Sequence, residues 1–147
     1  MTAHYIPDTL IYKGEEYVIF DGIVLFSSYL EQHQIELPKD MWTRRGYVAK
    51  WEIRENMLFL IELLALPPEG YHETCCIQSK RTVRNVGLDY FFPHQKTVLA
   101  DWYSGELMIC YERKYPIDDS INLTFMIDKG HIVEEKYQTH KEWYMSR

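Results

Sequence analysis

One short segment of the chain combines groups that bind metals and act as nucleophiles. His72, Cys75 and Cys76 lie within five positions of one another, and imidazole and thiolate groups bind zinc when four of them converge tetrahedrally. A structural zinc site needs a second closely spaced pair, whereas the remaining cysteine, Cys110, is distant in sequence. We therefore expect no metal site, and we expect Cys75 and Cys76 to act as small apolar side chains.

The other candidates for catalysis have no supporting pattern. A cysteine nucleophile needs a nearby base that lowers its pKa, and no family signature surrounds the vicinal cysteines. The serines lie in no nucleophile-elbow pattern, and the sequence has no glycine-rich phosphate loop. Adjacent acids such as Glu134 and Glu135 point to opposite faces of a strand, so they cannot both face one pocket. The chain is therefore expected to have no catalytic residues and no cofactor, and to be no enzyme.

Length and composition indicate one folded domain over residues 1–147. Of these 147 residues 46% are hydrophobic, and the net charge is -6. A chain of this size removes about two thirds of its unfolded surface from water, so it can build a core without disulfides. The acidic balance disfavours nucleic acid as a partner. The longest apolar run, residues 57–66, contains Glu62 and is shorter than the ~20 residues of a spanning helix, so we expect a cytoplasmic protein without membrane contact.

The elements that must position any site are mostly strands. Alternation of apolar and polar residues with period two dominates the sequence. It predicts that residues 10–12 pair with 17–20, 47–54 with 57–66, 98–103 with 107–111, and 121–127 with 131–137. A helical period predicts one short helix over 26–33, and the segment 67–95 has no clear period. The expected fold is mainly β (α+β with one short helix), with antiparallel hairpins in a curved sheet or small barrel of about eight strands.

Aromatic and acidic residues together suggest a surface that binds protein. The sequence contains twelve tyrosines and four tryptophans, and residues 1–36 and 101–135 each carry a net charge of -5. Tyrosine and tryptophan are enriched at protein interfaces, and an acidic surface attracts a basic partner over long range. The partner-binding candidates are Asp118, Asp119, Glu134 and Glu135 as charges, with Tyr115 and Tyr137 as anchors.

The same aromatic residues allow a different function. If the sheet forms a small barrel, its rings fill the interior or line a cavity for an apolar or aromatic ligand. The candidate lining residues are Tyr47, Trp51, Phe59 and Trp102. If the sheet stays open, its edge strands are either blunted by charged residues or paired with a second copy, so a homodimer also remains possible.

Three segments carry a resemblance to other proteins. They are RGYVAKWEI at 45–53, GLDYFFP at 87–93 and VLADWYSGEL at 98–107. Through them the chain resembles a group of small bacterial proteins of unassigned activity, which implies no catalytic residue for this sequence. In size and acidic charge the chain is similar to the immunity proteins encoded beside toxins. The resulting hypothesis is a cytoplasmic immunity or inhibitor protein that neutralises a bacterial toxin domain, such as a basic nuclease, by direct contact; the small-molecule-binding barrel is the alternative.

Overall fold

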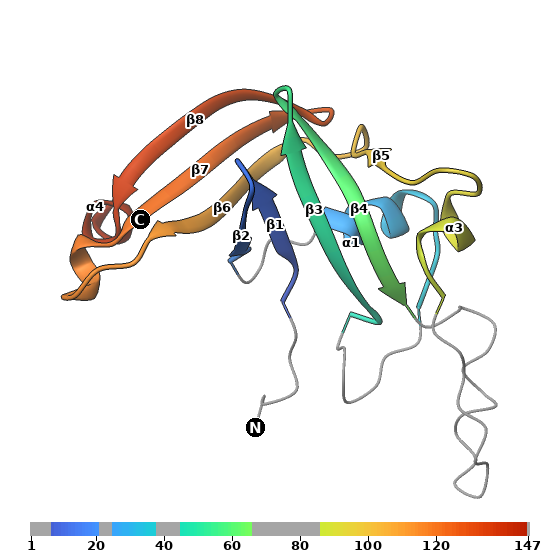
Figure 1. Ribbon diagram of the computed structural model, residues 1–147, viewed down its shortest axis with the longest axis horizontal. Helices are drawn as coiled ribbons and strands as arrows, with labels where there is room; N and C mark the ends of the chain where they lie inside the picture. Colours follow the sequence, from blue (N-terminus) through green and yellow to red (C-terminus); the bar gives the residue numbers. More distant parts are fainter. Residues whose placement is uncertain (1–6, 21–24, 38–44, 66–85, 147) are drawn as a thin grey trace, which may run out of the picture.

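The computed structural model describes residues 7–20, 25–37, 45–65 and 86–146 (Figure 1). The strands are β1 (Thr9–Tyr12), β2 (Glu15–Val18), β3 (Tyr47–Arg54), β4 (Met57–Ala65), β5 (Val98–Leu99), β6 (Gly105–Glu112), β7 (Ile121–Asp128) and β8 (His131–Thr139). The helices are α1 (Leu25–Gln32), α3 (Leu88–Phe91) and α4 (His140–Met145), with a 3-10 turn η1 (Ile117–Asp119). This confirms the predicted class, mainly β with about eight strands in a curved sheet. None of the helices in these ranges is long and apolar enough to cross a membrane.

The sheet consists of two ladders that are joined over a short distance. The first ladder contains β2, β1, β3 and β4, with β5 paired to β4, and the second contains β8, β7 and β6. The two ladders pair through Met57 of β4 and His131 of β8, and they diverge from this point (Figure 1). At the opposite edges, Ile19 forms an isolated bridge with Ile109 of β6. The sheet is therefore open and strongly curved, and its two edges meet at one bridge.

One strand pair is parallel, which the predicted hairpins did not include. Leu10 of β1 pairs with Trp51 of β3 in a parallel ladder, whereas β1 and β2 form the predicted antiparallel hairpin. Parallel neighbours need a crossover connection. The chain provides one here because α1, the predicted short helix, lies between β2 and β3 in sequence.

The prediction of a hairpin between residues 98–103 and 107–111 is wrong. β5 is only two residues long and pairs with β4, and β6 pairs with β7 instead. The chain leaves the sheet after Leu99, and the Trp102 ring packs toward α1, where its Nε1–H donates to the Leu25 carbonyl at 3.0 Å. Burial of this large ring outweighs the alternation that favoured a strand. Helices α3 and α4 were not predicted either, since both are short.

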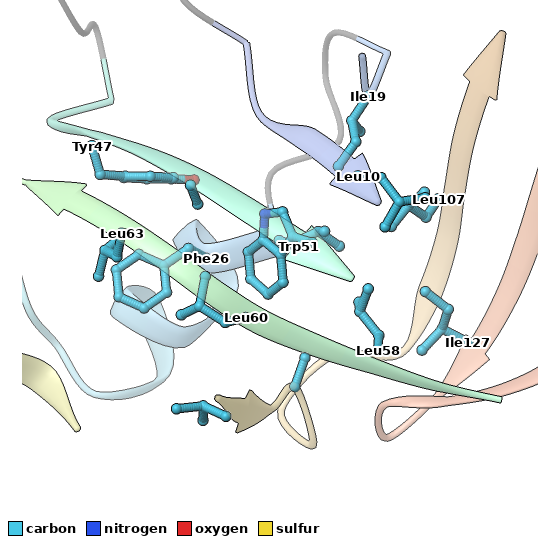
Figure 2. Packing of buried hydrophobic residues seen from close by; sticks show 14 of the residues in the cluster. Leu10, Ile19, Phe26, Tyr47, Trp51, Leu58, Leu60, Leu63, Leu107 and Ile127 are labelled. Atoms are coloured by element: carbon cyan, nitrogen blue, oxygen red, sulfur yellow. The ribbon is translucent and has the colours of Figure 1, made fainter. Parts of the chain in front are cut away.

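Side chains from both ladders form one core (Figure 2). Leu10 and Ile19 face Leu107, and Leu58 faces Ile127, so the concave sides of the two ladders meet in apolar contact (Figure 2). On the side of the first ladder, α1 and α3 cover this core (Figure 1). Most side chains of β8 and of the end near α4 are exposed to solvent, whereas Met108 and Asn122 of the second ladder are buried.

Candidate functional site

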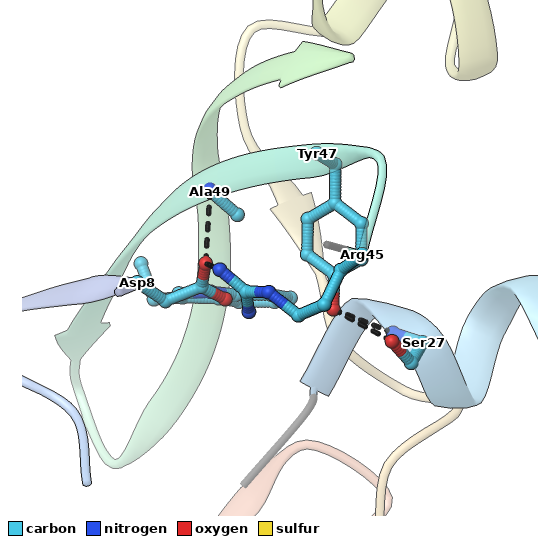
Figure 3. A network of polar contacts seen from close by, with 6 residues as sticks. Asp8, Ser27, Arg45, Tyr47 and Ala49 are labelled. Carbon is cyan, nitrogen blue, oxygen red and sulfur yellow. Dashed lines mark hydrogen bonds and ion pairs between the residues drawn. The ribbon is translucent and has the colours of Figure 1, made fainter. Parts of the chain in front are cut away.

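A buried polar network joins the start of β1 to β3 (Figure 3). The Asp8 carboxylate is 2% exposed and accepts hydrogen bonds from Ala49 N at 3.1 Å and from Trp51 Nε1 at 3.0 Å. Arg45 Nη2 lies 2.9 Å from Asp8 Oδ1. Burial raises the pKa of Asp8, and Arg45 together with these hydrogen bonds opposes that rise. Groups of the chain itself thus partly compensate the buried charge, and the network joins the start of β1 to β3.

A second part of this network fixes α1. The Tyr47 hydroxyl accepts a hydrogen bond from Ser27 N at 3.1 Å and lies 2.8 Å from Ser27 Oγ (Figure 3). The Arg45 guanidinium lies 4.6 Å from the centroid of the Tyr47 ring. Burial raises the pKa of Tyr47, so this phenol stays protonated at neutral pH and acts as a structural link.

The four residues proposed to line a ligand cavity do not surround one space. Tyr47 and Trp51 are fully buried, and Trp102 stacks on Phe92 with ring centroids 5.9 Å apart. Phe59 lies between two inward-facing leucines of β4, so its ring points to the other side of the sheet. There the Arg54 guanidinium covers it at 4.6 Å. Three of the four rings therefore belong to the packed core.

The six proposed partner-binding residues are divided among three places. Glu134 and Glu135 point to opposite faces of β8, because adjacent strand residues alternate. Glu134 lies in a groove of about 390 Å³ between α4 and the outer face of the second ladder. Glu135 and Tyr137 lie on the inner face, and Tyr115, Asp118 and Asp119 lie at the end near η1.

Tyr137 belongs to a group of four tyrosines from four different strands, which we call the tyrosine cluster: Tyr12, Tyr17, Tyr111 and Tyr137. Glu135 lies beside this cluster on β8. The Tyr17 and Tyr111 rings are stacked with centroids 5.8 Å apart. The Tyr137 ring meets Tyr111 edge-on at 5.5 Å. The Tyr12 hydroxyl donates to Glu135 Oε1 at 3.2 Å, which links β1 to β8. Burial and the nearby Glu135 carboxylate raise the pKa of Tyr12.

The remaining candidates lie on what we call the η1–α4 end: residues 115–120 and helix α4. The Ser120 side chain is buried and holds the turn closed, because its Oγ accepts from Lys114 N at 2.8 Å and donates to Lys114 O at 3.2 Å. His140 N donates to Ser120 O at 2.7 Å, which connects the turn to α4. A capping box between Thr139 and Glu142 fixes the first turn of α4.

This end presents large side chains to solvent on a fixed backbone. Tyr115 is 83% exposed, Tyr144 is 68% exposed and Met145 is 71% exposed. Asp118 and Asp119 are also exposed, and they belong to η1, which is in contact with α4. An apolar group of this kind with charged neighbours is typical of a protein-binding surface.

Comparisons with known proteins identify no relative of this chain. No protein-family model matches the chain, and searches of the curated proteins and of the solved structures give no match. The described residues contain no group of three or more His, Cys, Asp or Glu side chains placed to hold a metal ion. Cys110 is a free, half-buried thiol on β6, and the segment with His72, Cys75 and Cys76 lies outside the described residues.

Proposed function

We propose that this chain is a non-enzymatic binding protein that neutralises a protein partner through the η1–α4 end. The observation that carries the proposal is the exposure of Tyr115, Tyr144 and Met145 beside Asp118 and Asp119. The most concrete form is a cytoplasmic immunity or inhibitor protein for a bacterial toxin domain with a basic surface. The acidic charge and small size of the chain support this form.

The backbone of this end supports tight binding. Hydrogen bonds from Ser120 and His140 already fix the turn and the start of α4, so little conformational entropy is lost when a partner docks. Tyrosine is enriched among the residues that contribute most to protein binding, because its rigid ring gives a large contact area and its hydroxyl can form a hydrogen bond. The exposed tyrosines on this fixed backbone fit that role.

Charge and apolar contact have different roles in this proposal. The η1–α4 end contains Asp118, Asp119 and Glu142 against Lys141, and Arg113 and Lys114, which directly precede it, balance the two remaining acids. The whole chain carries a net charge of -6, so long-range attraction of a basic partner comes from the molecule as a whole. We therefore expect added salt to slow association, while the aromatic contacts continue to determine dissociation.

Affinity capture with three proteins tests this function. The wild-type chain, the surface variant D118K/D119K/Y144A and the control E31K/E36K are tagged and used to capture partners from the host. The control places two similar charge reversals at α1 and the residues after it, away from the η1–α4 end (Figure 1). A stoichiometric partner that binds the wild type and the control, and is lost with the surface variant, is the expected result.

Co-expression then tests neutralisation. The captured partner is expressed alone and together with each of the three proteins. Growth arrest by the partner alone that the wild type and the control relieve, and the surface variant does not, is expected. A partner that is harmless alone would contradict the inhibitor form, and equal capture by all three proteins would contradict the proposed surface.

A further inference from the structure

We propose that the tyrosine cluster is a binding site for an organic cation, namely the side chain of an arginine or lysine presented by a basic protein. This deepens the proposed function and rests on it for the identity of the partner. The assignment depends on three features: a group of stacked, partly exposed tyrosine rings, carboxylates at their border, and a cation of the chain already in contact with one ring.

The rings form a layered surface between the edges of the two ladders. Tyr12 is almost fully buried and packs on Phe125 with ring centroids 5.0 Å apart, so it forms the floor. Tyr17 and Tyr111 stack above it and are half-buried. Tyr137 is 50% exposed, and its ring borders the cluster on the side of β8. The faces of tyrosine rings attract cations through their negative quadrupole.

Two carboxylates border these rings. Glu135 shares the inner face of β8 with Tyr137, and Glu15 pairs with Tyr12 across the β1–β2 hairpin. Both glutamates are exposed, and neither forms an ion pair within the described part of the chain. Glu15 and Tyr17 lie on the same face of β2, two residues apart, and burial together with smaller contributions from Tyr111 and Glu15 raises the pKa of Tyr17. Two exposed carboxylates near these rings, without an ion pair among the described residues, favour a cation over a neutral ligand.

A cation of the chain itself already uses one of these rings. Lys13 Nζ lies 5.3 Å from the centroid of Tyr12. The positive φ of Lys13 (53°) and of Gly14 (83°) forms the tight turn that brings this ammonium back over the strand. Because Lys13 is exposed, its side chain can move aside. The cluster therefore attracts a positive group from within the chain, and a partner's arginine or lysine extends the same contact to Tyr137 and Glu135.

Titration of the full chain with small cations tests the site without any partner. The probes are N-acetyl-arginine amide, N-acetyl-lysine amide and the neutral N-acetyl-citrulline amide, and ring signals of the tyrosines are followed by NMR at constant ionic strength. We expect saturable shifts of Tyr17, Tyr111 and Tyr137 with at least one cationic probe, at about millimolar affinity, and no saturation with citrulline. Absence of saturable shifts, or equal shifts with citrulline, would overturn the proposal.

Three single substitutions test whether the cationic probe binds at the tyrosine cluster. Glu135→Gln keeps the shape of the side chain, and Tyr137→Ala removes an exposed ring, so both are expected to fold and to weaken the probe at least about fivefold. Tyr144→Ala is the matched control, because it removes an exposed tyrosine from the η1–α4 end. Equal weakening by the control would assign the shifts to general surface binding and overturn the site. Failure of this titration together with successful capture through the η1–α4 end would reject the cation site alone.

Discussion

Aromatic residues of this molecule have two kinds of surroundings, the buried core around α1 and the partly exposed tyrosine cluster and η1–α4 end. Around α1, rings such as Phe26, Tyr47 and Trp51 are fully buried, and the polar atoms of Tyr47 and Trp51 are hydrogen-bonded within the chain. Tyr137 of the tyrosine cluster, and Tyr115 and Tyr144 at the η1–α4 end, are exposed in regions that also carry exposed carboxylates. The two proposed sites differ from the core in having exposed rings near acids, so ring content alone does not indicate a binding site.

The largest change in the free energy of unfolding is expected from a substitution in the buried core around α1. Phe26 packs edge-on against Tyr47 at 5.2 Å and Phe91 at 5.5 Å, so Phe26→Ala leaves a cavity. We expect the free energy of unfolding to fall by about 3–5 kcal/mol. Tyr144→Ala should change it by less than about 0.5 kcal/mol, because that ring is exposed. Urea unfolding followed by tryptophan fluorescence measures both, and similar losses in the two variants would contradict the contrast between the regions.

The next effect concerns the charge buried in the core region. Asp8→Asn replaces a carboxylate that serves Ala49 N, Trp51 Nε1 and Arg45. An amide has one acceptor oxygen, so a buried donor loses its partner, and we expect a loss of about 1–3 kcal/mol. This loss is measured by urea unfolding at neutral pH. A variant as stable as the wild type would contradict the structural role of the network.

Comparison of the wild type with Asp8→Asn measures how Asp8 makes the free energy of unfolding depend on pH. Burial raises the pKa of Asp8 above its ordinary value of 3.8, so the folded state holds this proton more tightly than the unfolded chain. The contribution of Asp8 to the free energy of unfolding is therefore largest below pH 3.8 and falls as pH rises through the raised pKa. The difference between wild type and Asp8→Asn should decrease over this window and then level off. A difference that grows with pH would show that the folded pKa is depressed instead.

Binding by the η1–α4 end gives the third effect. Tyr115→Ala and Tyr144→Ala each remove a ring that makes little contribution to folding, as its exposure indicates. For a captured partner we expect each variant to lose about 1–2 kcal/mol of binding free energy, a factor of roughly 5–30 in Kd. Titration calorimetry with the partner measures the loss. Unchanged affinity in both variants would remove the η1–α4 end from the interface.

The sequence predicts local elements of this fold better than their partners in space. The strand over residues 47–54 is confirmed at its predicted bounds, because its alternation reflects one wet and one buried face. The pairing of Asp8 with Arg45 depends on the parallel contact of β1 with β3, which no local pattern reveals. Of the strand expected over 98–103, only Val98–Leu99 forms, and a turn follows in which Trp102 packs toward α1 and donates to the Leu25 carbonyl.

The residues of the tyrosine cluster were likewise predicted only in part from the sequence. The composition of the acidic segments indicated Glu135 and Tyr137, and they lie together on the inner face of β8. Their neighbours Tyr12 and Tyr17 were missed, although the alternation of residues 10–12 and the Lys13-Gly14 turn place both on one face of a hairpin. The contact between Tyr12 and Glu135 spans 123 residues, so it follows only from the curvature that brings the two ladders together.

The smallest change in the free energy of unfolding is expected from removing one hydroxyl group inside the tyrosine cluster. Tyr12→Phe removes the hydroxyl that donates to Glu135 Oε1 at 3.2 Å and keeps the ring on Phe125. We expect the free energy of unfolding to fall by about 0.5–1.5 kcal/mol, the usual contribution of one hydrogen bond. In a Glu135→Gln background the loss should be smaller, because the bond to a charged acceptor is already weakened. A double-mutant cycle in urea measures this coupling. If Tyr12→Phe costs the same in both backgrounds, the hydroxyl does not act through Glu135, and this hydrogen bond does not contribute to holding β1 against β8.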